Sequence, residues 1–317
     1  MTLAQRMRSI AQRAMLFLAI MGPGIITASA DNDASGVATY SMAGSFYGYG
    51  FLWALVWVTL GEVVTQEMAA RMGAVTGKGL TDLIRERWGV KIAFFVMVGL
   101  ILANLGTTAA QFAGIAASSE LFGVTRYLVV PLAALVMWFL VLRGSYRHVE
   151  KALLFLSLYA IAYVVSAFLA RPPWGEILRR TVVPTIHLER RFLLALLATV
   201  GTTMTPWGCA YMQASVADKG VTLKEYPYTR LDVTVGAIMG NIVSGFIIVC
   251  TAATLFAHGI RVEMAEQAAL ALEPLAGQWA KQLFGIGLLG ASLLAASVLP
   301  LATTYAVCEA FGWERGI

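Results

Sequence analysis

Long apolar windows, each able to cross a lipid bilayer, follow one another through most of this 317-residue chain. A backbone in hydrocarbon has no water to bond with, so it must form helices or a closed barrel, and windows of this length favour helices. Only 13% of the residues are charged. The sequence therefore predicts an all-α polytopic membrane protein with eight spans, at about residues 15–44, 47–70, 91–117, 127–143, 149–170, 192–217, 230–257 and 283–309.

The charged residues indicate how these spans are oriented. If the N-terminus is inside, most of the 23 Lys and Arg residues fall in cytoplasmic segments, which is the usual bias of membrane proteins. We therefore expect a multi-pass protein of the plasma membrane with a cytoplasmic tail at 1–14. The net charge of +5 is assigned to this topology, and no nucleic-acid partner is expected.

Three segments between the spans have amphipathic patterns. The basic stretch at 78–89 is expected to form a helix at the inner membrane surface. The arginine-rich stretch at 171–191 is expected to be a structured outer loop. The stretch at 263–282 is expected to form an outer interfacial helix that is kinked or broken near Pro274.

Span one is interrupted by two carboxylates, Asp31 and Asp33, with Asn32 between them. Each carboxylate at that depth costs roughly 2.5–3.5 kcal/mol on insertion scales, so the pair needs a partner. No Lys or Arg lies between Arg13 and Arg71. A broken membrane helix with such carboxylates predicts a cation site, and the alternative is a pair stabilised by helix-terminus donors.

Span six is interrupted in a similar way. The run GTTMTP ends at Pro206, which removes a backbone donor, so the helix is expected to open near Thr202 and Thr205. Because spans one and six are five spans apart, the two broken segments should run in opposite directions. This pattern is typical of an inverted-repeat transporter, with a first repeat at 15–170, an outer loop at 171–191 and a second repeat at 192–317.

Three motifs give the chain a recognisable resemblance. GPGIITASADNDASGVATYSMAG in span one, AARMGAVTGKGLTDLIRERWG after span two and GTTMTPWGCAYMQASVADKG in span six together resemble the Nramp superfamily of divalent metal transporters. The resemblance covers nearly the whole chain and implies an inverted-repeat fold of the five-plus-five type. It also implies alternating access as the mechanism of transport.

That resemblance implies a role for each of five positions. Asp33 is similar to the family's metal-binding aspartate, and Gly36 stands where the family has a ligating Asn. Thr202 would supply a backbone carbonyl, Thr205 replaces a metal-binding Met, and Trp207 replaces a His.

These replacements favour a hard cation. Without the thioether the site loses its soft ligand, and the change at Gly36 is expected to leave room for water. Mg²⁺ keeps several waters, so Mg²⁺ is the expected substrate, with Mn²⁺ also accepted. Proton coupling is not expected, because Leu100 and Ala103 are aligned with the family's proton-relay acids. The chain thus most resembles the Nramp-related magnesium transporter branch.

Other polar residues within the spans have less definite roles. Asp31 is assigned either to the site or to its vestibule, and Glu62 and Gln213 are candidates for the ion path. Asn104, Gln111 and Asn241 are interpreted as interhelical hydrogen-bonding groups, the usual role of amides in membrane spans.

Several alternatives remain open. One is a proton-coupled Mn²⁺ or Fe²⁺ importer of the Nramp type, and another is an organic-solute transporter, which the twin aspartates disfavour. The chain ends at Ile317 soon after span eight, so a non-transporting fragment or membrane scaffold is a further alternative. No enzyme motif or resident cofactor is found, the expected partners are a divalent cation and the bilayer, and the oligomeric state is left open.

Overall fold

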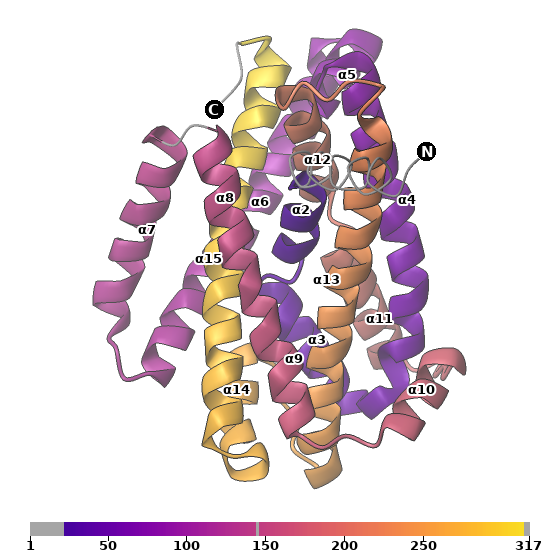
Figure 1. The fold of residues 1–317 in the computed structure, drawn as a ribbon, viewed down its shortest axis with the longest axis vertical. Coiled ribbons are helices and arrows are strands. Elements are labelled where there is room, and N and C mark those ends of the chain that lie inside the picture. Colours follow the sequence, from indigo (N-terminus) through magenta and orange to yellow (C-terminus); the bar gives the residue numbers. More distant parts are fainter. Residues whose placement is uncertain (1–21, 144–145, 314–317) are drawn as a thin grey trace, which may run out of the picture.

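The computed structural model describes residues 22–143 and 146–313 and is built from helices packed side by side (Figure 1). Six of its segments are long and apolar enough to cross a membrane, and α7 adds a shorter apolar helix. The predicted all-α class is confirmed. The span helices are α4 (Leu52–Thr76), α6 (Val90–Leu121), α7 (Arg126–Arg143), α8 (Tyr146–Leu156) continued by η2 (Ser157–Tyr159) and α9 (Ala160–Leu169), α13 (Tyr226–Thr254) and α15 (Gln278–Phe311).

Span one is broken where its carboxylates lie. It consists of α2 (Pro23–Ala30) and α3 (Ala34–Tyr47), and the residues before Gly22 lie outside the described part of the chain. Proline at the first position of α2 suits a helix start because its missing N–H would have no partner there. Asp33 caps α3 by accepting a hydrogen bond from the Gly36 N–H at 2.6 Å.

Span six is broken in the same manner. It consists of α11 (Arg190–Thr203) and α12 (Pro206–Asp218), separated by Met204 and Thr205. In Figure 1, α2 and α12 lie toward the end of the molecule occupied by α5 (Leu80–Trp88), and α3 and α11 lie toward the end occupied by α10 (Trp174–Val182). The two broken segments therefore run in opposite directions, as predicted, and the C-terminal ends of α2 and α11 point to the middle of the molecule.

Two of the three amphipathic stretches form short helices between the spans, and the side of the membrane expected for each stays a prediction. Helices form in both the 78–89 and 171–191 stretches, as α5 and α10. Helix α14 (Ala265–Ala276) includes Pro274 and ends two residues later, before Gly277, whose φ is +88°, so the predicted break near the proline is confirmed. Its Ala268, Ala269 and Leu272 are fully buried, so α14 packs into the bundle against α15 instead of lying only at the interface. The remaining short elements are the 3₁₀ turns η1 (Gly48–Phe51) and η3 (Phe256–His258).

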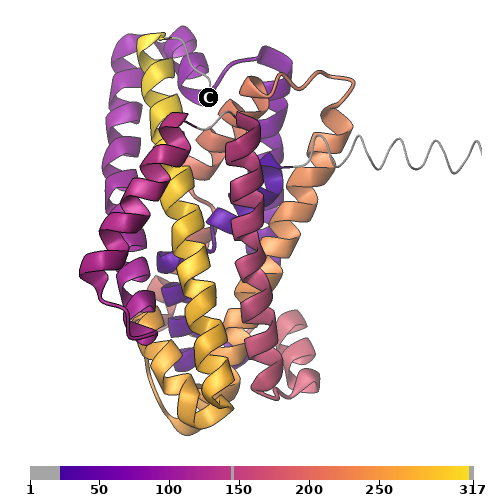
Figure 2. The same cartoon turned by 60° about the vertical axis from the view of Figure 1, so that its left-hand side comes forward.

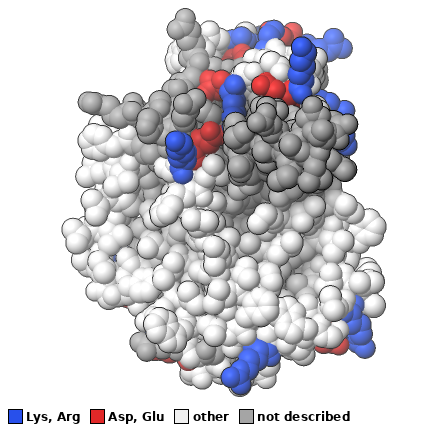
Figure 3. All heavy atoms as spheres, viewed as in Figure 1, with Lys and Arg blue, Asp and Glu red and all other residues white. Residues whose placement is uncertain are grey.

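The molecular surface matches a bilayer environment. In Figure 3 the charged side chains gather at the two ends of the molecule, and the band between them is nearly free of charge on the face shown. Large apolar side chains such as Trp57, Leu102 and Leu132 are more than half exposed. Figure 2 shows α15 at the centre of another face of the bundle, and much of this helix is buried. The outer side chains suit lipid, and the helices share a continuous core.

Helix α2 is joined to α13 along its whole length. At its N-terminus, the Gly24 N–H donates to the Asp232 carboxylate at 2.7 Å. At its C-terminal end, the Asn32 side chain donates to the Gly240 carbonyl at 2.9 Å and accepts from Ser244 Oγ at 2.7 Å. Small residues allow the two backbones to come this close, as is common between membrane helices.

Gly236 is the position where this approach is closest. A Cβ atom added there would lie 2.5 Å from the Gly24 carbonyl oxygen, so the contact is with backbone and cannot be relieved by a side-chain movement. We expect Gly236→Ala to lower the stability of the protein by about 1–3 kcal/mol through overpacking. Thermal unfolding followed by circular dichroism in detergent would measure it. Gly106→Ala on α6, where a Cβ meets nothing within 4 Å, is the matched control, and equal unfolding midpoints for the two variants would contradict the prediction.

Candidate metal-binding site

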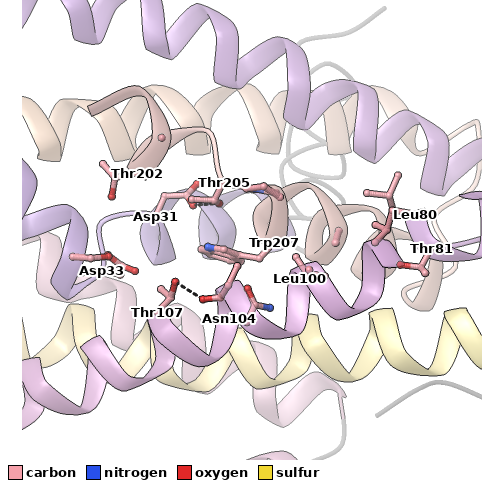
Figure 4. Close-up of a pocket in the computed structure, with 17 residues that line it drawn as sticks. Asp31, Asp33, Leu80, Thr81, Leu100, Asn104, Thr107, Thr202, Thr205 and Trp207 are labelled. Atoms are coloured by element: carbon pink, nitrogen blue, oxygen red, sulfur yellow. Dashed lines mark hydrogen bonds between the residues drawn. The ribbon is translucent and has the colours of Figure 1, made fainter. Parts of the chain in front are cut away.

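A cavity of about 320 Å³ lies where the two helix breaks face each other. One wall comes from Asp31, Asp33 and Ser35 at the break of span one, and the opposite wall from residues 201–210 of span six. Helix α6 lines a third side, and Leu80 and Thr81 at the start of α5 lie at one end (Figure 4). The sequence predicted this meeting of the two breaks.

Asp33 is buried and held by three donors. Its Oδ1 accepts from Ser35 Oγ and from the Gly36 N–H, both at 2.6 Å, and its Oδ2 accepts from Gln111 Nε2 at 2.8 Å. A carboxylate offers about four lone-pair sites, so Asp33 retains acceptor capacity for a cation. These three donors fix the orientation of the Asp33 carboxylate and still leave a lone pair that can bind a cation.

Asp31 connects the two broken spans. Its Oδ1 accepts from Thr205 Oγ1 at 2.9 Å, and its Oδ2 has no hydrogen-bond partner among the described residues. The side chain is 4% exposed. A buried carboxylate oxygen without a partner costs about 1–3 kcal/mol or more, and either a cation in the cavity or a proton on the neighbouring Glu62 carboxyl would offset this cost. Asp31 and Thr205 thus lie together at the site, as the sequence indicated.

The Thr202 carbonyl is freed by the chain that follows it. In a continuous helix this oxygen would accept from the residue four positions later, which is Pro206 and has no N–H. Thr202 lines the cavity, near the C-terminal end of α11. Carbonyls at a helix C-terminus carry partial negative charge, which favours a cation.

The structural role of Gly36 differs from the expected one. An added Cβ would lie 2.8 Å from the Asp31 carbonyl oxygen and 3.4 Å from Thr202 Oγ1. A side chain at this position would thus collide with the backbone of its own span and touch span six, so the expected extra room for water is not seen here. The contribution of Gly36 to the site is the N–H bound to Asp33.

The remaining predicted residues are distributed around the site. Trp207 lines the cavity and is 4% exposed. Glu62 lies outside the cavity lining, where it accepts a hydrogen bond from Asn241 and its carboxyl is within hydrogen-bonding contact of Asp31. Gln213 is buried away from the lining and donates to the Lys78 carbonyl at 2.9 Å. Trp207 and Glu62 are thus close to the aspartates, and Gln213 is not in the cavity wall.

Gln111 is the site residue that sequence reasoning underestimated. It is fully buried on α6, donates to Asp33 Oδ2, and accepts from the Ala34 N–H at 2.9 Å. It is an interhelical hydrogen-bonding group, as expected, but its partner is the predicted metal ligand. Asn104, Thr107 and Gln111 follow one face of α6 at helical spacing, and this polar stripe was the available signal.

We expect Gln111→Leu to reduce cation uptake at least tenfold. The substitution leaves Asp33 Oδ2 and the Ala34 N–H without their partner, at a cost of about 1–3 kcal/mol each. Uptake at several cation concentrations would measure the effect, which should appear mainly in the apparent affinity. Ser118→Ala, which removes a hydroxyl elsewhere on α6, is the control. Normal affinity in Gln111→Leu would show that Asp33 needs no such support.

Comparisons with known proteins extend this description. A sequence model of the natural resistance-associated macrophage protein-like (Nramp) family matches residues 24–317. The chain belongs to the Nramp family. It is 32% identical over 296 residues to the divalent metal cation transporter MntH of Erwinia tasmaniensis, across 90% of this chain and 71% of that protein. It is 31% identical over 294 residues to MntH of Klebsiella pneumoniae, across 90% and 70%.

Solved structures show the same fold. The Eremococcus coleocola manganese transporter in complex with an aromatic bis-isothiourea substituted compound aligns with a TM-score of 0.77 and 22% identity. The alignment covers 94% of this chain and 66% of that one, so the chain spans just under two thirds of the solved manganese transporter. The predicted inverted-repeat transporter fold is confirmed. These relatives are named as transporters, in agreement with the prediction that the chain is not an enzyme.

Proposed function

We propose that the protein moves divalent metal cations across the membrane by alternating access. The observation that carries this proposal is the single cavity that receives Asp31 and Asp33 from span one and Thr202 and Thr205 from span six. Asp33 and the Thr202 carbonyl would bind the cation directly, and Asp31 and the Thr205 hydroxyl would complete the site. The names of the MntH relatives support the class of substrate.

The donors favour a hard cation. All the side-chain ligands just named offer oxygen, and Met204 directs its sulfur toward Gly61 of α4, where an added Cβ would lie 3.0 Å from Sδ. Oxygen donors suit Mg²⁺ and Mn²⁺, whereas a thioether would favour softer metals. Mg²⁺ is therefore the proposed substrate, with Mn²⁺ also carried. Leu100 and Ala103 line the cavity with apolar side chains, which supports uptake without protons.

The second candidate is a proton-coupled manganese importer. It is favoured by the solved relative, which is a manganese transporter, and by the MntH relatives. The two candidates differ in which metal is carried faster and in whether protons accompany it.

Liposome uptake would test both. The purified chain is reconstituted with either a magnesium-sensitive or a manganese-sensitive dye, and a pH-sensitive dye is used in parallel. The proposal expects Mg²⁺ influx and no metal-dependent pH change inside. Faster Mn²⁺ influx with internal acidification would favour the second candidate, and no influx of either metal by the folded chain would favour a non-transporting fragment or scaffold.

A further inference from the structure

Asn104 occupies the cavity wall between the candidate metal site and α5. It lies on α6 seven residues before Gln111, the partner of Asp33, a separation of about 10 Å along a helix. Figure 4 shows the order along this wall, with Asp33, Thr107, Asn104 and then Leu100 toward Thr81. Asn104 is only 2% exposed.

The hydrogen bonds of Asn104 fix which way its amide points. Its Nδ2 is 2.8 Å from Thr303 Oγ1 on α15, and the Thr303 hydroxyl is 2.8 Å from the Leu299 carbonyl. A hydroxyl has one hydrogen, which Thr303 gives to that carbonyl, so Thr303 can only accept from Asn104. The amide nitrogen must therefore face α15.

The amide oxygen of Asn104 therefore points away from α15. Asn104 Oδ1 has no hydrogen-bond partner among the described residues, although Asn104 lines the cavity. A buried acceptor in this state costs about 1–3 kcal/mol unless something in the cavity bonds to it. Its neighbours on the same wall, Leu100 and Ala103, are apolar, and the Thr107 hydroxyl donates to the Ala103 carbonyl.

We propose that Asn104 Oδ1 accepts hydrogen bonds from the water molecules bound to a divalent cation, as the cation passes between Asp33 and the α5 end of the cavity. This inference rests on the proposed function and adds a residue to its path. Water bound to a cation is a stronger donor than bulk water, because the charge polarises its O–H bonds. An acceptor that contacts water instead of metal favours the ion that keeps its waters, which is Mg²⁺ over Mn²⁺.

The test compares two substitutions on the same hydrogen bond. Asn104→Leu removes the acceptor, and Thr303→Val removes the interhelical bond but keeps the amide on α6. In the full chain, Mg²⁺ uptake is expected to fall about tenfold in Asn104→Leu and Mn²⁺ uptake by no more than about threefold. Thr303→Val should keep both rates within about twofold of the parent, because the amide stays at the same place on α6 and its oxygen can still face the cavity. Asn104→Asp restores an acceptor and should recover Mg²⁺ uptake.

Two other uptake results would overturn the proposal. Equal loss of Mg²⁺ uptake in Asn104→Leu and Thr303→Val would assign Asn104 to helix packing alone, and unchanged uptake in Asn104→Leu would remove it from the path. Calorimetric titration of Mg²⁺ into the same purified proteins separates this proposal from the transport proposal. Mg²⁺ binding that depends on Asp33 and weakens in Asn104→Leu would support the role of Asn104 even if the parent shows no flux. Absence of such binding in the parent would overturn both the role of Asn104 and the transport proposal. If Asn104→Leu does not fold, Asn104→Ala against Asn104→Asp gives the same comparison.

Discussion

Asp33→Ala is expected to abolish divalent cation uptake, by at least about a hundredfold, while the protein is still made and inserted. The substitution removes a buried carboxylate from the cavity wall, and the freed carbonyl of Thr202 cannot supply the lost charge. A charge-assisted contact in a site shielded from water is worth more than an ordinary hydrogen bond, so no neighbouring oxygen compensates. Uptake of Mg²⁺ and Mn²⁺ into dye-loaded liposomes would measure the loss.

The same carboxylate also caps α3, so a second variant is needed to separate the two roles. Loss of an N-cap costs about 0.5–2 kcal/mol, and asparagine caps as well as aspartate. Asp33→Asn should therefore keep the cap, although its Nδ2 would face the Gln111 Nε2 donor, so its unfolding midpoint should fall less than that of Asp33→Ala while uptake is still lost. Near-normal transport in Asp33→Asn would contradict the assignment of Asp33 as a charged ligand, since only its capping function would then be required.

Thr205→Met is expected to reverse the preference for the hard cation. The Thr205 hydroxyl donates to Asp31 Oδ1 at 2.9 Å, and methionine cannot make this bond. Its thioether is a soft ligand that discriminates against Mg²⁺ and accepts transition metals. We expect Mg²⁺ uptake to fall at least tenfold and uptake of Mn²⁺ or Cd²⁺ to be kept or raised, measured as competition between pairs of metals.

The matched control for this change is Thr205→Ser, which keeps a hydroxyl in nearly the same place. It should leave the ratio of Mg²⁺ to Mn²⁺ uptake within about twofold of the parent, because one hydrogen bond to a charged group is retained. An unchanged ratio in Thr205→Met would mean that residue 205 does not touch the cation, and the hard-donor argument would fail at this position.

The sequence predicted the breaks in spans one and six because their causes are local. Pro206 removes a donor wherever it lies in a helix, and the run from Asp31 to Gly36 is a poor helix former in any context. Their opposite directions followed from counting the spans between them. The amphipathic helix at 80–88 was visible for the same reason, since its pattern is complete within a few turns.

Other features depend on contacts between distant parts of the chain and were not visible. Gln111 is 78 residues from Asp33, and nothing in its own neighbourhood distinguishes it from an ordinary buried amide. The contact between Gly36 and the Thr202 hydroxyl joins positions that lie far apart in the sequence. Helix α14 ends two residues after Pro274, close to the predicted break, but the burial of Ala268 and Leu272 in the bundle depends on packing against α15.

In span one, the segments before and after the break are hydrogen-bonded to different helices, and each segment carries one of the two carboxylates. Asp31 follows α2, which Asp232 and Asn32 fasten to α13, while Asp33 and the start of α3 are fastened to α6 by Gln111. The residues 31–33 therefore form the joint between the two attached segments, with one carboxylate at each end of it. Any rocking of α2 and α13 against α6 must change the separation of Asp31 and Asp33, so a cation held by both would resist that motion and its release would permit it.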